Sequence, residues 1–125
     1  MDFIVFPAID LRAGQVVRLA EGDPARQTAY SNDPAAAAER WLSEGARWLH
    51  VVNLDGAFDQ PDAANRAALR AILAVASQAG ANVQFGGGLR SLDAVRVALD
   101  LGVERVVLGT LAVERPDLLA DAIRQ

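Results

Sequence analysis

Short apolar runs rich in β-branched residues alternate along this chain with alanine-rich amphipathic stretches of helix length. This alternation constrains the fold more than any other feature, because it is typical of βαβ units built around a parallel sheet. Four such units can be counted. The expected strands are 3–9, 48–54, 82–85 and 105–108, and a further extended segment is expected at 15–19. We therefore predict an α/β fold in a single module covering residues 1–125.

Capping residues and glycines indicate where the helices begin and end. Asp33 followed by Pro34 is typical of a helix start, since the carboxylate can accept from free backbone N–H groups and proline suits the first helical position. Gly45 then indicates the end of that helix. By the same reasoning, further helices are expected from Asp62 to Gly80, from Ser91 to Gly102, and from Pro116 to the end of the chain.

Composition excludes several classes of function. With 52% apolar and 22% charged residues in 125, the chain has enough material for one buried core. Its net charge is −4 and it has no run rich in lysine or arginine, so we expect neither nucleic acid nor a membrane surface as a partner. No apolar run approaches the roughly 20 residues that span a bilayer, and no signal peptide is recognisable, so the expected location is the cytoplasm.

Metal chemistry is not expected either. The chain has no cysteine and one histidine, which rules out a disulfide framework, a thiolate metal site and a histidine cluster. That histidine, His50, lies within an apolar strand. It is either a hydrogen-bonded core or interface residue or a catalytic group. Trp41 and Trp48 are expected to pack the first helix onto the sheet.

Two successive predicted strands end in glycine. Because ligands of parallel α/β proteins bind beyond the carboxyl ends of the strands, Gly87, Gly88, Gly109 and Thr110 are candidates for one site. Glycine lets backbone N–H groups approach a ligand closely, and the helix that follows presents its positive amino end. Arg90 can add charge. Glycines can instead merely make tight turns, but two adjacent glycine-ended strands favour a phosphate site.

The remaining polar candidates are open to two interpretations each. Asp10 directly follows an apolar strand, so it is either a general base at the rim of the sheet or the cap of its own turn. Asp55 precedes Gly56, which indicates a turn first and a ligand contact second. Arg18 is either a solvated edge charge or a side chain that reaches back over the site.

Four segments resemble, in order, the strand ends of the phosphoribosylformimino-aminoimidazole carboxamide ribotide isomerases of histidine biosynthesis. They are PAIDLRAGQVVRL at 7–19, LHVVNLDGA at 49–57, QFGGGLRS at 84–91 and VLGTLA at 107–112. The related cyclase subunit of imidazole glycerol phosphate synthase usually has Leu-Asp-Val and a lysine-containing loop in the first segment. Ile9-Asp10-Leu11-Arg12 therefore favours the isomerase, with the cyclase lineage as an alternative.

The resemblance implies a fold and an activity. It implies the N-terminal half of a (β/α)8 TIM barrel, and an Amadori rearrangement of an aminoaldose to an aminoketose that needs no cofactor. The substrate of the family is a ribotide with a phosphate at each end, and Asp10 matches the general base. The positions that match one phosphate site and its surroundings are Gly87, Gly88, Arg90, Gly109, Thr110 and Arg18, with Asn53 and Asp55 as further candidates for substrate binding.

The family also has features without a counterpart in these 125 residues. Its general acid follows the fifth strand and its second phosphate site lies in the other half of the barrel, so weak activity or none is expected from this chain alone. Asn53 stands where the family usually has aspartate. A half-barrel would leave its first and fourth strands as open edges, which predicts pairing with a second copy or a complementary C-terminal half. The alternative is a phosphate-binding, self-associating scaffold without turnover.

Overall fold

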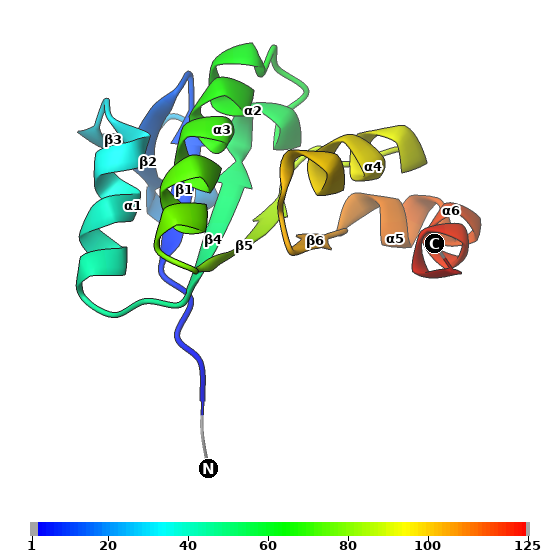
Figure 1. Ribbon diagram of the computed structural model, residues 1–125. Helices are drawn as coiled ribbons and strands as arrows, with labels where there is room; N and C mark the ends of the chain where they lie inside the picture. Colours follow the sequence, from blue (N-terminus) through cyan, green and yellow to red (C-terminus); the bar gives the residue numbers. More distant parts are fainter. Residues whose placement is uncertain (1–2, 125) are drawn as a thin grey trace.

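The computed structural model describes residues 3–124, so the expected module is seen without its first two residues and its last one. A single sheet has the strand order β3-β2-β1-β4-β5-β6 (Figure 1). The strands are β1 (Ala8–Arg12), β2 (Gln15–Leu19), β3 (Gln27–Ser31), β4 (Trp48–Asn53), β5 (Asn82–Gly86) and β6 (Arg105–Val107). The helices are α1 (Pro34–Ser43), α2 (Leu54–Ala57), α3 (Ala63–Gln78), α4 (Leu92–Leu101), α5 (Thr110–Glu114) and α6 (Pro116–Arg124), with a 3-10 turn η1 (Ala20–Gly22).

The sheet is mostly parallel, which confirms the predicted α/β class. Strands β1, β4, β5 and β6 are parallel neighbours, whereas β2 and β3 add to the outer side of β1 as an antiparallel hairpin. The prediction that the first strand is an open edge was therefore wrong. The chain turns back immediately after β1 because Ala13 and Gly14 both have positive φ, at 50° and 75°, as a tight hairpin turn requires. The edge strands are β3 and β6.

One face of the sheet carries the core. Strand residues alternate between faces, and Ile9, Leu49 and Val51 are completely buried on the side covered by α1 and α3. Helix α3 buries Leu69 and Ile72 against them. Each such side chain contributes roughly 1.5–3 kcal/mol of hydrophobic stabilisation. None of the helices in 3–124 is long and apolar enough to cross a membrane.

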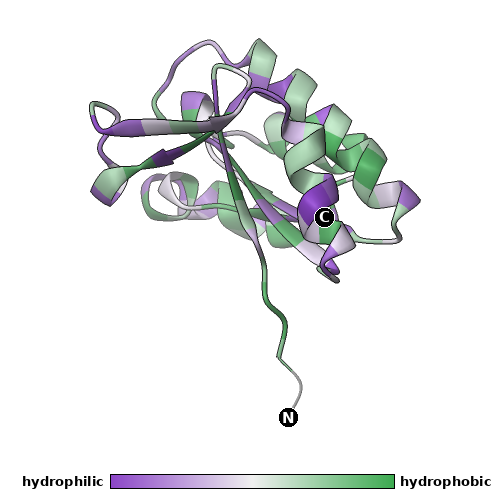
Figure 2. Cartoon of the chain, turned by 90° about the vertical axis from the view of Figure 1, so that its left-hand side faces the viewer, coloured by the Kyte–Doolittle hydropathy of each residue, from purple (hydrophilic) through white to green (hydrophobic). Residues whose placement is uncertain are grey.

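The first strand begins later than predicted. We expected 3–9, but β1 is Ala8–Arg12, and the preceding segment extends away from the sheet as an apolar arm (Figure 2). Phe3, Ile4 and Val5 are 82%, 59% and 66% exposed. The apolar run alone suggested a strand, yet a strand also needs a partner. The parallel register with β4 starts only at Ala8.

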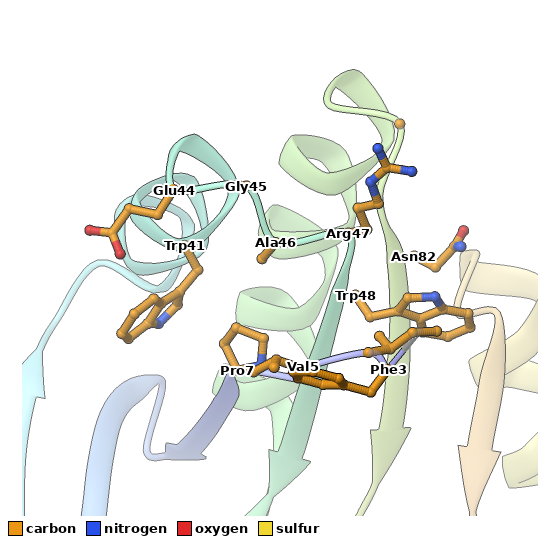
Figure 3. A pocket seen from close by; sticks show the side chains of 12 residues that line it. Phe3, Val5, Pro7, Trp41, Glu44, Gly45, Ala46, Arg47, Trp48 and Asn82 are labelled. Atoms are coloured by element: carbon orange, nitrogen blue, oxygen red, sulfur yellow. The ribbon is translucent and has the colours of Figure 1, made fainter. Parts of the chain in front are cut away.

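A cavity of about 730 Å³ lies between this apolar arm and the amino end of β4 (Figure 3). Trp48 borders it on the face of the sheet opposite the core, with its ring 5.2 Å from that of Phe6. Trp41 packs against the core from α1, as predicted, but the expectation that Trp48 does the same was wrong. The alternation of β4 places Leu49 toward the helices and Trp48 away from them.

Candidate functional site

The carboxyl ends of the four parallel strands form one rim, and the strand register sets the positions along it. Asp10 of β1 is in register with Val52 of β4. Val52 is in register with Gly86 of β5, and Gly86 with Val107 of β6. Three strand spacings separate β1 from β6, or roughly 14 Å. Asp10 and the segments that follow β5 and β6 therefore share one edge of the sheet.

Asp10 lies within β1, two residues before its end, rather than directly after the strand as predicted. Its neighbours Ile9 and Leu11 are buried against the helices, so the alternation of the strand places Asp10 on the open face. Partial burial raises the pKa of the Asp10 carboxyl, and a positive charge on nearby His50 acts against that shift. A carboxylate with a raised pKa is a stronger proton acceptor than an aspartate in water.

The predicted phosphate residues converge on one cavity. It has a volume of about 220 Å³ and lies between the loops that follow β5 and β6. Its lining residues are Gly87, Gly88, Arg90, Gly109 and Thr110, together with Ala57, Leu89 and Val107. All five residues that the sequence indicated for phosphate are in this set. We refer to it below as the glycine cavity.

The fold itself requires two of these glycines. Gly87 and Gly88 have φ values of 108° and 76°, and a Cβ on either would come within 2.3 Å of Asn53 or 2.6 Å of Gly56 backbone atoms. Gly109 differs, because its φ is −101° and no described atom lies within 4 Å of the place a Cβ would occupy. The tight-turn interpretation thus accounts for Gly87 and Gly88, while Gly109 lines the cavity at a position where packing does not require a glycine.

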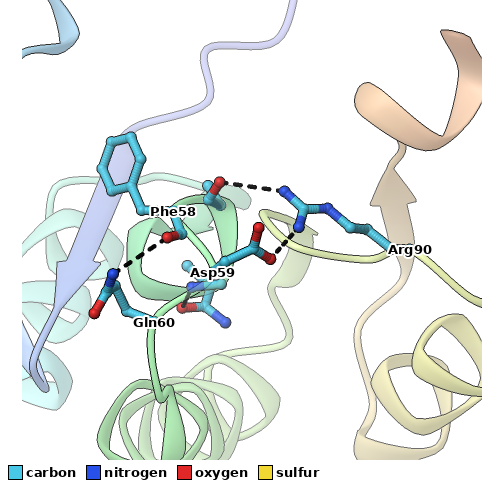
Figure 4. A network of polar contacts seen from close by, with 7 residues as sticks. Phe58, Asp59, Gln60 and Arg90 are labelled. Atoms are coloured by element: carbon cyan, nitrogen blue, oxygen red, sulfur yellow. Dashed lines mark hydrogen bonds and ion pairs between the residues drawn. The ribbon is translucent and has the colours of Figure 1, made fainter. Parts of the chain in front are cut away.

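Arg90, which lines the glycine cavity, reaches over to Asp59 in the loop after α2 (Figure 4). Its Nη1 is ion-paired with the carboxylate of Asp59, and its Nη2 donates to the carbonyl oxygen of Ala57 at 3.4 Å. Both charged side chains are partly exposed, so water and anions can compete for this pair. The guanidinium is available to an anion in the cavity once it leaves Asp59.

Asn53 and Asp55 are both buried, and both have hydrogen-bond partners inside the protein. Asn53 Oδ1 accepts from Gly56 N at 3.0 Å, and its Nδ2 donates to Asp62 Oδ2 at 2.9 Å. Asp55 Oδ2 accepts from Ala13 N at 2.7 Å. These bonds tie α2 to the start of α3 and to the turn after β1. A role of either residue in substrate binding stays a prediction.

The sequence did not indicate a role for Asn65 of α3, although this residue bonds both the turn after β1 and Asn53. It is 1% exposed, its Oδ1 accepts from Gly14 N at 2.8 Å, and its Nδ2 donates to Leu11 O and Asn53 Oδ1, both at 2.9 Å. The one available signal is an amide side chain at a position that shares a helix face with Leu69, Ile72 and other apolar residues. Such a residue is buried only when its polar atoms are all bonded.

Arg18 is not part of the glycine cavity. It lines, together with Asp10, a separate cavity of about 680 Å³ between the β1–β2 hairpin and α1. The side chain is exposed on β2. The register of β1 with β2 places Arg18 on the helix-covered face with Ile9, so its side chain lies away from both the phosphate residues and the open face that carries Asp10.

His50 has a hydrogen bond on the open face of the sheet. The other two residues of this arrangement, Gln84 and Arg105, were not predicted from the sequence. Its Nδ1 is 3.0 Å from Gln84 Nε2, and Gln84 Oε1 accepts from Arg105 Nε at 2.9 Å. This confirms that His50 is hydrogen-bonded. No group of three or more potential metal-binding side chains occurs within residues 3–124.

Comparison with known families bears on the chemistry of this rim. The sequence profile described as "Histidine biosynthesis protein" matches residues 4–125. The chain belongs to this family. Proteins of the histidine biosynthesis family have the TIM-barrel fold, and the parallel β1-β4-β5-β6 arrangement with intervening helices agrees with it.

Curated relatives within the histidine biosynthesis family are about half identical to the chain. The identity is 55% over 120 residues with the protein from Thermomicrobium roseum, covering 96% of this chain and 48% of the relative. With the Syntrophobacter fumaroxidans protein it is 50% over 119 residues (95% and 45%), and with that from Rhizorhabdus wittichii 50% over 125 residues (100% and 50%). All three are named 1-(5-phosphoribosyl)-5-((5-phosphoribosylamino)methylideneamino) imidazole-4-carboxamide isomerase. The chain spans about half the length of the curated relatives it matches.

Proposed function

We propose that this chain is a half-barrel that supplies the general base and one phosphate site of the isomerisation for which its relatives are named. The observation that carries the proposal is the convergence of Gly87, Gly88, Arg90, Gly109 and Thr110 on one cavity. Asp10 lies at the same level of the sheet on β1. A ribotide with its phosphate in the glycine cavity can extend along the rim toward Asp10.

In this proposal the substrate is a bis-phosphorylated aminoaldose. Ring opening with the nitrogen protonated gives an iminium ion. The Asp10 carboxylate then removes the proton from C2, the electron pair of that bond forms the C1–C2 double bond of an enaminol, and the C=N π pair becomes the lone pair of the nitrogen. Return of a proton to C1 and loss of the proton from the C2 hydroxyl give the aminoketose. The atoms balance without a cofactor or an oxidant. The raised pKa of Asp10, caused by burial, suits the first step.

The general acid and the second phosphate site of the proposed reaction come from a complementary half or from a second copy. The edge of β6 supports such pairing, because its outer backbone groups have no partner strand within 3–124 and Val107 is 44% exposed. The exposed apolar arm, Phe3 to Val5, is a further surface that an assembly can cover. The same observations favour the second candidate, a self-associating phosphate-binding scaffold without turnover.

An activity measurement separates the two candidates. The chain is assayed alone and mixed with the part of the Thermomicrobium roseum isomerase that has no counterpart in it, with Asp10→Asn as the control. We expect turnover in the mixture and a loss of about 10²-fold or more in the variant, which is the usual contribution of a general base. A mixture without turnover whose chain still binds phosphate supports the scaffold. Turnover that Asp10→Asn leaves unchanged contradicts the assignment of the base.

A further inference from the structure

Three polar side chains lie in a row on the open face of the sheet, outside the machinery proposed so far. His50 on β4 is in register with Gln84 on β5, and Gln84 with Arg105 on β6. The row lies two residues nearer the amino ends of the strands than Asp10. On β1 the register partner of His50 is Ala8, whereas Asp10 is the register partner of Val52. His50 and Asp10 thus face the same side of adjacent strands.

The hydrogen bonds of this row have only one possible direction. Arg105 Nε can only donate, so the Gln84 atom 2.9 Å from it must be the carbonyl oxygen. The other end of the Gln84 amide is then the NH2 group, which also can only donate, and it lies 3.0 Å from His50 Nδ1. Nδ1 must therefore accept, and the proton of the neutral ring must be on Nε2.

The arginine that begins this row is itself held in place. Its guanidinium lies 4.5 Å from the ring centre of Trp48 and 5.2 Å from that of Phe6. A cation over an aromatic ring is attracted by the negative face of the ring. Arg105 is thus fixed by two rings on one side and by Gln84 on the other.

We propose that Arg105 and Gln84 are positioning residues that hold His50 in the single neutral form protonated on Nε2, so that the ring presents an N–H donor beside Asp10. Nε2 has no hydrogen-bond partner among residues 3–124, and the ring is only partly buried. The use of this donor rests on the proposed function: it binds an oxygen of the open-chain sugar while Asp10 removes a proton. With a proton on Nδ1, two donors, Nδ1–H and the Gln84 NH2, would face each other and could not form a hydrogen bond.

Two charged side chains lie near His50. Asp10 faces it from β1 and Arg105 approaches from β6 through Gln84, while Gln84 itself on β5 carries no charge. A neutral His50 adds no positive charge beside the base. Burial, which raises the pKa of Asp10, is then opposed less.

Nitrogen NMR of the imidazole tests the proposal directly, because the chain has one histidine and its signals need no assignment. We expect the two ring nitrogens of the wild-type chain at neutral pH to differ widely in shift, with Nδ1 unprotonated and Nε2 protonated. Gln84→Glu replaces the donor by a carboxylate that accepts from both neighbours. It should therefore protonate Nδ1 and reverse or remove the difference. Arg105→Met should yield a mixture of tautomers, because the Gln84 amide is then free to flip.

Arg70→Met is the matched control, since it removes an arginine from the exposed face of α3 and should leave the imidazole spectrum unchanged. A wild-type ring protonated on Nδ1, or a ring whose form does not change in Gln84→Glu and Arg105→Met, overturns the inference. The measurement needs no substrate, so its outcome is independent of the isomerase assay. A chain with the expected tautomer and no activity in the mixture would contradict the proposed function alone.

Discussion

Asp10 on β1 and Gly86 on β5 lie level with each other across the sheet, because both are in register with Val52 of the strand between them. Gly86 is followed directly by Gly87, which lines the glycine cavity, so this cavity lies just beyond the level of Asp10 on the same side of the sheet edge. The distance between Asp10 and Gly86 is set by the strand spacing of the sheet and not by flexible loops. The predictions below test the parts of this arrangement separately.

Replacing Asp10 by asparagine should stabilise the fold at neutral pH, because it removes a partly buried charge. The pKa of Asp10 is raised in the folded state, so the folded chain holds this proton more tightly than the unfolded chain. The stability that the carboxyl contributes is present at low pH and is lost as the pH rises through the raised pKa. Urea unfolding of both proteins across pH should therefore show a gain at neutral pH that disappears in acid.

Asp100→Asn is the control for that series, because Asp100 is an exposed carboxylate on α4. It should show no comparable gain. If Asp10→Asn lowers the free energy of unfolding at pH 7, the carboxylate is stabilised by its surroundings and the account of its environment is wrong.

Two alanine substitutions in the glycine cavity separate folding from binding. Gly88→Ala should lower the free energy of unfolding by at least about 1–2 kcal/mol, because φ is positive and its Cβ would lie 2.6 Å from Gly56 backbone atoms. Gly109→Ala should leave stability almost unchanged, since nothing described lies within 4 Å, while the methyl group weakens phosphate binding. Denaturant unfolding and phosphate titration of both variants would decide this. Equal destabilisation by the two changes would contradict it.

Asn53→Asp should destabilise the chain by about 1–3 kcal/mol at neutral pH. The change replaces the Nδ2 donor by an oxygen that faces Asp62 Oδ2, now 2.9 Å from Nδ2. Adding Asp62→Asn restores a donor and an acceptor, so the double variant should recover most of the loss in urea unfolding. If Asn53→Asp alone is as stable as the wild type, the hydrogen bond between Asn53 and Asp62 does not require asparagine at position 53.

Releasing Arg90 should strengthen anion binding. Asp59→Asn removes the charge that pairs with the guanidinium, and asparagine tolerates the positive φ of 56° at this position. An exposed pair of this kind is worth roughly 0.2–1 kcal/mol, so phosphate affinity should rise by up to about fivefold. Isothermal titration with inorganic phosphate measures it. Unchanged affinity would mean that Arg90 does not contact the anion.

The sequence indicated those features that local chemistry determines. Asp33 and Ser91 cap α1 and α4 as predicted, each accepting from the backbone N–H three residues later at 3.1 Å. The glycine cavity was predictable because residues after neighbouring parallel strands must meet at one edge. Strand β3 was not, because its residues are mostly exposed and polar and it exists only by pairing with β2.

Features that depend on the register between strands could not be predicted from the sequence. Whether the apolar arm forms a strand is decided by where β4 begins, and the row His50, Gln84 and Arg105 forms only because three strands align at one level. Asn53 looked like a ligand position beside the site. Its partners Asn65 and Asp62, which lie on or just before α3, give it a structural role that its own segment does not reveal.

The central claim is that the loops after β5 and β6 form a phosphate site at the same rim as Asp10. Amide NMR of the chain during titration with inorganic phosphate, against chloride at the same ionic strength, tests it most directly. We expect saturable shifts at the backbone amides of Gly87, Gly88, Gly109 and Thr110, and none of this size with chloride. If those four amides do not respond, or respond equally to chloride, there is no phosphate site at this rim.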